Sequence, residues 1–256
     1  MRSVTCIACI AICVLSPLPA LAAPEEIQVY LDEFADPGKF GLDFHTNYVL
    51  KADPGATARN MLRVTPELSY GINDHWEGAL YWLTSVGPEQ EGGQPVSDGF
   101  KLRLKWRPSA PSKDSPWYWA VNVEVGQLAP RFYPDQTSGE MKFIGVWKSG
   151  SWTLGGNLNL DRALRSDAQQ GTTMELDGKI AYRVASAREL DLQLGVEHYA
   201  GLGTLTNLYS SDARTSMTFL VADFDFKDWD FNIGWGWASG ATQDNVILKA
   251  IIGVPL

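Results

Sequence analysis

Hydrophobic and polar residues alternate with a period of two along most of this chain. The most regular stretch is Lys39–Leu50, where Phe40, Leu42 and Phe44 begin an apolar parity and the positions between are polar or small. Such alternation predicts a β-strand with one apolar face. About eleven residues is long for a soluble sheet and matches the roughly 9–11 residues of a tilted strand that crosses a bilayer.

The same alternation recurs to the end of the chain. Pro66 falls in the second stretch, although proline cannot donate to a sheet ladder. About twelve strands are predicted, and ten or fourteen would require one miscounted hairpin. They are Lys39–Leu50, Met61–Tyr70, Trp76–Val86, Gly99–Arg107, Trp117–Gln127, Glu140–Trp147, Ser151–Leu160, Thr173–Val184, Leu190–Tyr199, Ser216–Phe226, Trp229–Ala238 and Val246–Val254.

The connections between these strands alternate in length. Mostly short turns, such as 148–150 and 227–228, alternate with longer polar segments such as 87–98 and 200–215. Short turns on one rim and long loops on the other are typical of outer-membrane barrels. Because the series starts and ends on a long loop, we expect an even strand number and both termini at the periplasmic side.

An apolar strand face can pack on a second sheet or face lipid in a closed barrel. Three features favour lipid. The last strand keeps strict alternation and resembles the terminal strand that the barrel-assembly machinery reads, and the polar parity is densely charged with both signs. All ten tryptophans lie in predicted strands, and six lie beside short turns, where an aromatic girdle forms. These six are Trp76, Trp106, Trp117, Trp147, Trp152 and Trp229.

We therefore predict an all-β protein, a single antiparallel transmembrane β-barrel over residues 39–256 in a Gram-negative outer membrane. Residues 1–22 read as a signal peptide, with Arg2, an apolar run and an Ala20-Leu21-Ala22 cleavage site. Residues 23–38 form a periplasmic lead-in segment that carries a possible strand at 27–32. Its role stays open, and filling of the lumen is one possibility.

Composition narrows the chemistry. Cys6, Cys9 and Cys13 all lie in the predicted signal, so the mature chain has neither a disulfide framework nor a thiolate zinc site. The formal charge is −9, and loss of Arg2 leaves 20 Lys and Arg against 30 Asp and Glu. That balance argues against nucleic acid as a partner. We expect no cofactor.

Three segments carry a family resemblance: Asp43–Tyr48, Thr65–Gly71 and Gly99–Trp106. They resemble a group of uncharacterised proteobacterial outer-membrane proteins, and the chain is distantly similar to barrels grouped with phenol meta-pathway transporters. The resemblance implies a transporter-like barrel and transfers neither a substrate nor functional residues.

The charged parity supplies the candidate site residues, which we expect to face the lumen. They are Asp43, His45, Asn47, Arg63, Glu67, Glu77, Lys101, Arg103, Lys105, Glu124, Glu175, Asp177, Lys179 and Arg183. Lys101, Arg103, Lys105 and Arg107 form a basic ladder. The ladder either attracts anions into a pore or pairs with acids on neighbouring strands.

Other chemistry is less favoured. His45 beside Asp43 could bind a metal or act as a base, but the three histidines lack metal-ligand spacing, and a lumen hydrogen-bond network is the simpler interpretation. Ser69 and His45 share a parity on adjacent strands, which leaves an acyl hydrolase or acyltransferase as an alternative, yet no nucleophile elbow surrounds Ser69. The sequence favours a narrow channel or transporter for small solutes that contacts outer-membrane lipid. A plugged structural or partner-binding barrel is the main rival.

Overall fold

The computed structural model describes residues 26–54, 56, 58–87, 93–112, 114–130, 136–165, 171–187, 190–242 and 244–256. The predicted signal peptide, residues 1–22, lies outside this part of the chain. Among the described residues, no helix is long and apolar enough to cross a membrane.

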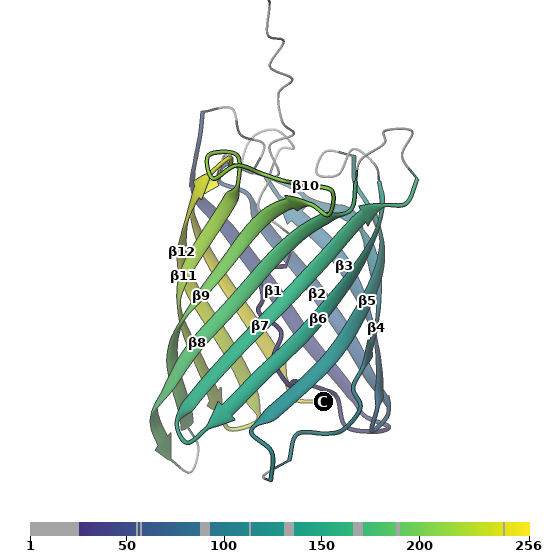
Figure 1. Cartoon of the computed structure of the whole chain (residues 1–256), viewed down its shortest axis with the longest axis vertical. Coiled ribbons are helices and arrows are strands. Elements are labelled where there is room, and N and C mark those ends of the chain that lie inside the picture. The colour runs from purple at the N-terminus through teal and green to yellow at the C-terminus, as the bar shows by residue number, and fades with distance from the viewer. Residues whose placement is uncertain are drawn as a thin grey trace, which may run out of the picture.

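Twelve long antiparallel strands form a closed barrel, as the sequence predicts (Figure 1). They are β1 (Phe40–Ala52), β2 (Leu62–Asn73), β3 (Trp76–Val86), β4 (Pro95–Trp106), β5 (Trp117–Leu128), β6 (Thr137–Ser149), β7 (Trp152–Ala163), β8 (Thr173–Ala187), β9 (Leu190–Thr204), β11 (Thr215–Phe226), β12 (Trp229–Gly240) and β13 (Asp244–Val254). The short strand β10 (Asn207–Leu208) pairs with the end of β9. Each of the twelve long strands pairs with the next long strand in the sequence, and β1 with β13 closes the sheet.

Most strands extend further toward the long loops than the alternation predicts. Strand β9 ends at Thr204 rather than Tyr199, and β4 begins at Pro95 rather than Gly99. Gly99 has a φ of +131°, which is open to glycine, and the β3–β4 register shifts nearby, between Leu83 and Thr84. This bulge breaks the two-residue period, so the sequence pattern stops at Gly99 although the strand continues.

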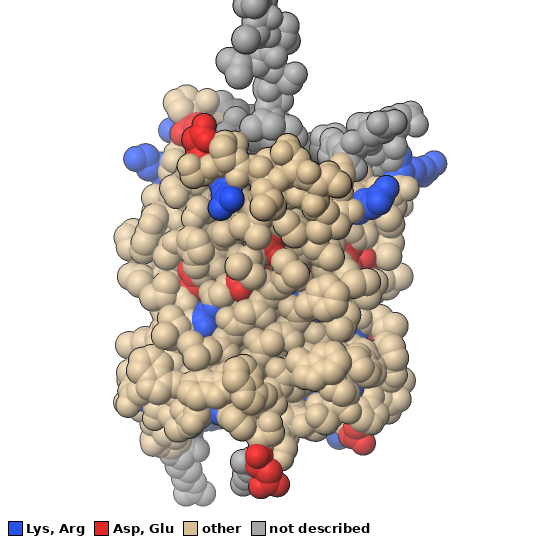
Figure 2. All heavy atoms as spheres, in the orientation of Figure 1, with Lys and Arg blue, Asp and Glu red and all other residues tan. Residues whose placement is uncertain are grey.

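The two faces of the wall differ as predicted. Large apolar side chains such as Leu102, Trp119 and Leu220 are exposed on the outside, while Arg63, Glu77 and other charged side chains are buried inside. Figure 2 shows charged residues at the two ends of the barrel and a largely uncharged band between them. In hydrocarbon, a closed barrel is the only sheet that leaves no unpaired backbone edge. The apolar band therefore contacts lipid, and the protein is an outer-membrane barrel.

The aromatic girdle forms at the short-turn end. Trp76 lies opposite Trp106, and Trp117 opposite Trp147, on neighbouring strands. The ring centroids of Trp106 and Trp119 are 5.4 Å apart in an edge-on contact. These rings lie next to turns, where an amphipathic indole is favoured at a membrane interface.

Candidate functional site

The N-terminal segment, residues 26–37, runs inside the barrel before β1 begins (Figure 1). The strand that we considered at 27–32 does not form, because this segment has no neighbouring strand to pair with. Ile27, Val29, Tyr30 and Leu31 are at most 8% exposed. They pack with inward-facing apolar residues of the wall, among them Tyr118, Ala120, Ile144, Val146, Phe219 and Val221. Apolar side chains from several strands around the lumen, β5, β6 and β11 among them, therefore form the packing surface for this segment.

The backbone of the N-terminal segment bonds to side chains of the wall. The Tyr30 N–H donates to Oδ1 of Asn157 at 2.7 Å, and Nδ2 of Asn157 donates to the Tyr30 carbonyl at 2.9 Å. Lys249 donates to the Ile27 carbonyl at 3.0 Å, and Lys105 to the Glu33 carbonyl at 2.8 Å. These bonds satisfy buried backbone groups that a sheet would otherwise satisfy.

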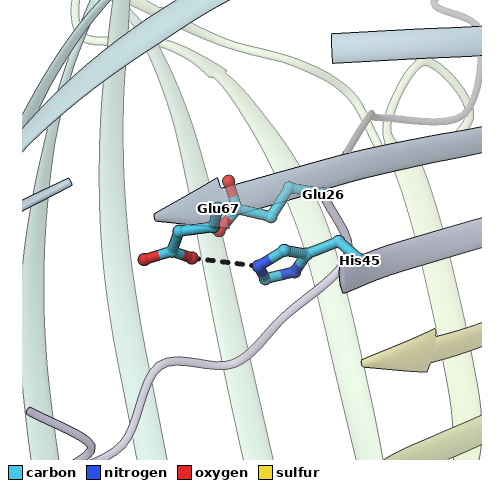
Figure 3. Close-up of side chains that lie close together, drawn as sticks. All are labelled: Glu26, His45 and Glu67. Carbon is cyan, nitrogen blue, oxygen red and sulfur yellow. Dashed lines mark hydrogen bonds and ion pairs between the residues drawn. The ribbon is translucent and has the colours of Figure 1, made fainter. Parts of the chain in front are cut away.

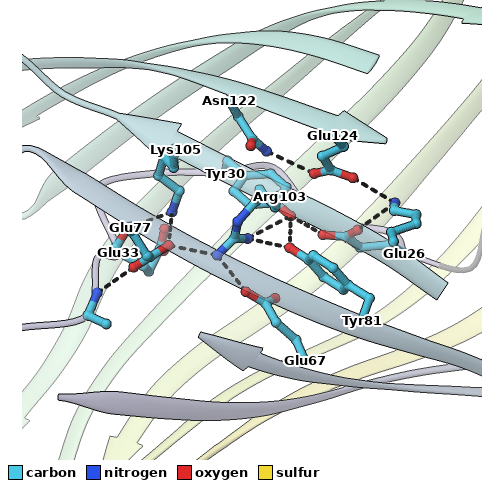
Figure 4. Close-up of polar contacts among 12 residues, drawn as sticks. Glu26, Tyr30, Glu33, Glu67, Glu77, Tyr81, Arg103, Lys105, Asn122 and Glu124 are labelled. Carbon is cyan, nitrogen blue, oxygen red and sulfur yellow. Dashed lines mark hydrogen bonds and ion pairs between the residues drawn. The ribbon is translucent and has the colours of Figure 1, made fainter. Parts of the chain in front are cut away.

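The basic ladder of β4 meets acids on both sides (Figure 4). Nη2 of Arg103 lies 2.5 Å from Oε1 of Glu67 and 2.7 Å from Oε1 of Glu77. Lys101 lies 2.8 Å from Glu124 and 3.2 Å from Glu26 of the N-terminal segment. Lys105 lies 3.4 Å from Glu77, so three of the four ladder cations have acids within ion-pair distance and are not free to attract anions. The fourth, Arg107, donates to the Asp74 carbonyl at 2.8 Å and stacks on the Phe34 ring.

Tyr30 joins the segment to this network. Its hydroxyl lies 3.0 Å from that of Tyr81 and accepts a hydrogen bond from Nη1 of Arg103 at 3.2 Å. It also donates to Glu26. Nζ of Lys142 lies 4.3 Å from the centre of the Tyr30 ring, a cation–π contact. One aromatic side chain thus contacts cations from two strands.

Two groups of the segment have displaced pKa values. Burial raises the pKa of the Glu26 carboxyl, but Lys101 and His45 outweigh burial and hold that pKa well below its usual range. Burial, and then the Glu26 carboxylate, raise the pKa of the Tyr30 phenol. Glu26 is therefore an anion and Tyr30 a neutral donor.

His45 lies within this network (Figure 3). Its Nε2 is 3.0 Å from Oε2 of Glu67, and ligand atoms of His45, Glu26 and Glu67 all lie within 4.8 Å of one another. A metal ion would take such a donor set. Here Lys101 and Arg103 already neutralise the two carboxylates, so the arrangement fits an ion-pair network better than a metal site.

A second network lies on the opposite wall. Lys179 of β8 is 3.0 Å from Glu197 and 2.7 Å from Asp223, and Lys249 of β13 also pairs with Glu197. Of the remaining predicted lumen residues, Asn47 and Arg63 are buried partners in the β1–β2 register, and Asp177 accepts from Asn159 at 2.7 Å. Asp43 and Glu175 are half-buried. Arg183 lies near the short-turn rim, 3.0 Å from Asp191, with 42% of its side chain exposed.

A cavity of about 610 Å³ remains beside the N-terminal segment. Asp43 and Ser69 line it from β1 and β2, Asp225 from β11 and Asp230 from β12. Polar side chains dominate this wall. The lumen thus keeps a space of solute size although the segment occupies much of it.

Comparison with known proteins supports the fold. No family model and no curated protein sequence matches the chain. The structure is similar to an outer-membrane channel from Pseudomonas putida F1, with 11% identity and a TM-score of 0.57 over 89% of this chain and 99% of that one. The KdgM porin is 9% identical, with a TM-score of 0.56 over 84% of this chain and 99% of that one. The NanC porin is 13% identical, with a TM-score of 0.53 over 83% of this chain and 97% of that one. At such identities the likeness concerns the barrel alone.

The sequence raised filling of the lumen by the N-terminal segment as one possibility, but it did not identify the wall residues against which the segment packs. Gly155 shows why: a Cβ there would collide with Leu31, so this glycine leaves room for a residue 124 positions away. The inward-facing Tyr118, Ala120, Ile144 and Val146 interrupt the polar parity of β5 and β6. That interruption was the available signal, since an inner wall facing only water has no need of apolar side chains.

Proposed function

We propose that this protein is a narrow outer-membrane channel or transporter for small solutes, through which solutes pass beside the N-terminal segment. The observation that carries the proposal is the polar cavity of about 610 Å³ inside a closed barrel. Eight-stranded barrels are filled by side chains and sixteen-stranded porins leave an aqueous channel. A twelve-stranded barrel lies between them, so a partly filled lumen fits a narrow route.

Further parts of the proposal concern biogenesis and kinship. Residues 1–22 act as a cleaved export signal, residues 23–38 are exported with the barrel, and the barrel-assembly machinery inserts β13 and its neighbours. The proposed relationship to phenol meta-pathway transporters rests on the sequence resemblance alone.

The alternative function, an outer-membrane hydrolase, has weak support. His45 lies opposite Thr65, and Ser69 lies four residues further along β2, roughly 13 Å away at 3.3 Å per residue.

The test is single-channel recording on the refolded full-length protein, with liposome swelling in small sugars and amino acids. We expect small, stable conductance steps and swelling only with the smallest solutes. A folded barrel that gives neither would favour the rival function, a plugged structural barrel. A lipid hydrolysis assay distinguishes the channel from the enzymatic alternative. Hydrolysis by the wild type that is lost in Ser69→Ala would support the enzyme.

A further inference from the structure

The wall of the cavity beside the N-terminal segment carries unequal charge. Nine carboxylates line it, against four Lys or Arg side chains. Arg103 pairs with Glu67 and Glu77, Lys105 with Glu77, Lys148 with Asp32, and Lys179 with Glu197 and Asp223. All four cations of the wall are thus already paired with carboxylates.

Among the described residues, four of the nine carboxylates have no such partner. One of them, Glu33, belongs to the N-terminal segment and accepts a hydrogen bond from the backbone N–H of Leu31 at 3.0 Å, and the other three belong to the barrel wall. In the part of the chain that the structure describes, Asp43, Asp225 and Asp230 form no ion pair. All three line the cavity. They extend from three different strands, β1, β11 and β12, at the short-turn end.

The strand register brings these three acids together. Asp225 lies directly opposite Asp230, while Gly253 of β13 lies between Asp230 and Asp43. A Cβ on Gly253 would lie 3.0 Å from Oδ1 of Asp43 and 3.2 Å from Oδ2 of Asp230. Both carboxylates therefore lie close to this glycine, on either side of it. Like charges directly opposite each other on neighbouring strands are destabilising.

A further acceptor lies beside them. Asn232 of β12 donates through Nδ2 to Asp223 at 2.6 Å, and its Oδ1 is buried without a donor. Asn232 also lines the cavity. The wall therefore offers carboxylate and amide oxygens in excess of the donors that the protein supplies, and such oxygens attract hydrated cations and repel anions.

We propose that this part of the lumen, defined by Asp43, Asp225, Asp230 and Asn232, makes the channel selective for small cations. The inference rests on the proposed channel function and adds its substrate class. Counter-cations from solution offset the mutual repulsion of the three carboxylates. An anion that passes the segment would meet uncompensated negative charge at the same level.

The experiment measures the reversal potential of the refolded protein in a planar bilayer under a KCl gradient. We expect a potential of the sign that potassium preference gives. The triple variant Asp43→Asn, Asp225→Asn, Asp230→Asn should shift this potential toward zero or to the chloride side. The control triple Asp74→Asn, Asp114→Asn, Asp212→Asn removes three exposed charges outside the barrel wall and should leave the potential unchanged.

Heat-dependent migration in gels shows whether each variant is folded. The single variants Asp43→Asn and Asp230→Asn replace the triple if it does not fold, and each should give part of the shift. Chloride preference in the wild type, or a potential that the lumen variants leave unchanged, overturns the inference while the channel stands. Absence of any current from folded protein overturns the channel and this inference with it.

Discussion

Tyr30 and Asn157 are 127 residues apart in the chain and are joined by two hydrogen bonds inside the barrel. The Asn157 side chain accepts from the backbone N–H of Tyr30 and donates to the carbonyl of the same residue. One amide side chain therefore does for Tyr30 what a neighbouring strand does for a residue in a sheet. This contact anchors the N-terminal segment to β7.

Asn157→Ala should loosen that anchor. The substitution leaves a buried N–H and a buried carbonyl unpaired, at a cost of roughly 1–3 kcal/mol for each group. We expect a lower unfolding temperature in detergent, measured by heat-dependent gel migration. Because all three cysteines lie in the predicted signal, a Gln28→Cys probe reports segment exposure, and thiol labelling should become faster in the Asn157→Ala background.

Asn159→Ala is the matched control. Asn159 lies on the same inner face of β7, two residues away, but bonds to Asp177 rather than to the segment. Its loss should leave Gln28→Cys labelling unchanged. If Gln28→Cys is labelled at the same rate in the Asn157→Ala and Asn159→Ala backgrounds, Asn157 does not anchor the segment.

Removal of Arg103 should be far more damaging than removal of Arg183. Arg103→Gln leaves Glu67 and Glu77 buried without their main cation, and breaking one partner of a buried pair typically costs about 3–5 kcal/mol. Arg183→Gln breaks a half-exposed rim pair, typically about 0–1 kcal/mol. Unfolding temperatures of the two variants compare these costs directly. Similar values for the two would show that the central network contributes little to stability.

The barrel itself could be predicted from the sequence because its wall obeys a local rule. In β3 inward and outward side chains alternate along the whole strand, and its predicted and observed bounds, Trp76–Val86, coincide. At Gly99 the local rule failed, since a bulge changes the parity without ending the strand. The alternation of short and long connections was then enough to predict that each long strand pairs with the next one in the sequence.

The contents of the lumen could not be predicted in the same way. Tyr30 meets Asn157, Tyr81 and Arg103 from three strands, and no periodicity in residues 26–37 specifies those contacts. The charged parity gives only the wall residues that we expect to face the lumen. The choice of ion-pair partners depends on strand register and on the path of the N-terminal segment. Both are features of the tertiary structure that a local sequence pattern does not specify.

Glu26→Gln should make stability less dependent on pH. Lys101 and His45 hold the pKa of Glu26 below its usual range, so the ionised form is favoured in the folded state. A carboxyl of this kind adds stability above the unfolded pKa of about 4.3, and the gain is lost as the pH falls through the folded value. At pH 7 the variant should unfold at a lower temperature than the wild type. The gap should narrow as the pH is lowered below about 4, and a gap that is constant across this range would contradict the ionised state of Glu26.

Tyr30→Ala should widen the route past the N-terminal segment. The Tyr30 side chain lines the cavity inside the barrel and is 2% exposed, so its truncation leaves a space beside the surrounding ion pairs. We expect a larger single-channel conductance in planar bilayers. Tyr30→Phe loses only the hydroxyl contacts and should conduct almost as the wild type does. Trp119→Ala removes a large ring from the lipid-facing side and should leave the conductance unchanged. If Tyr30→Ala conducts no better than Trp119→Ala, solutes do not pass beside Tyr30, and the route must lie elsewhere in the barrel.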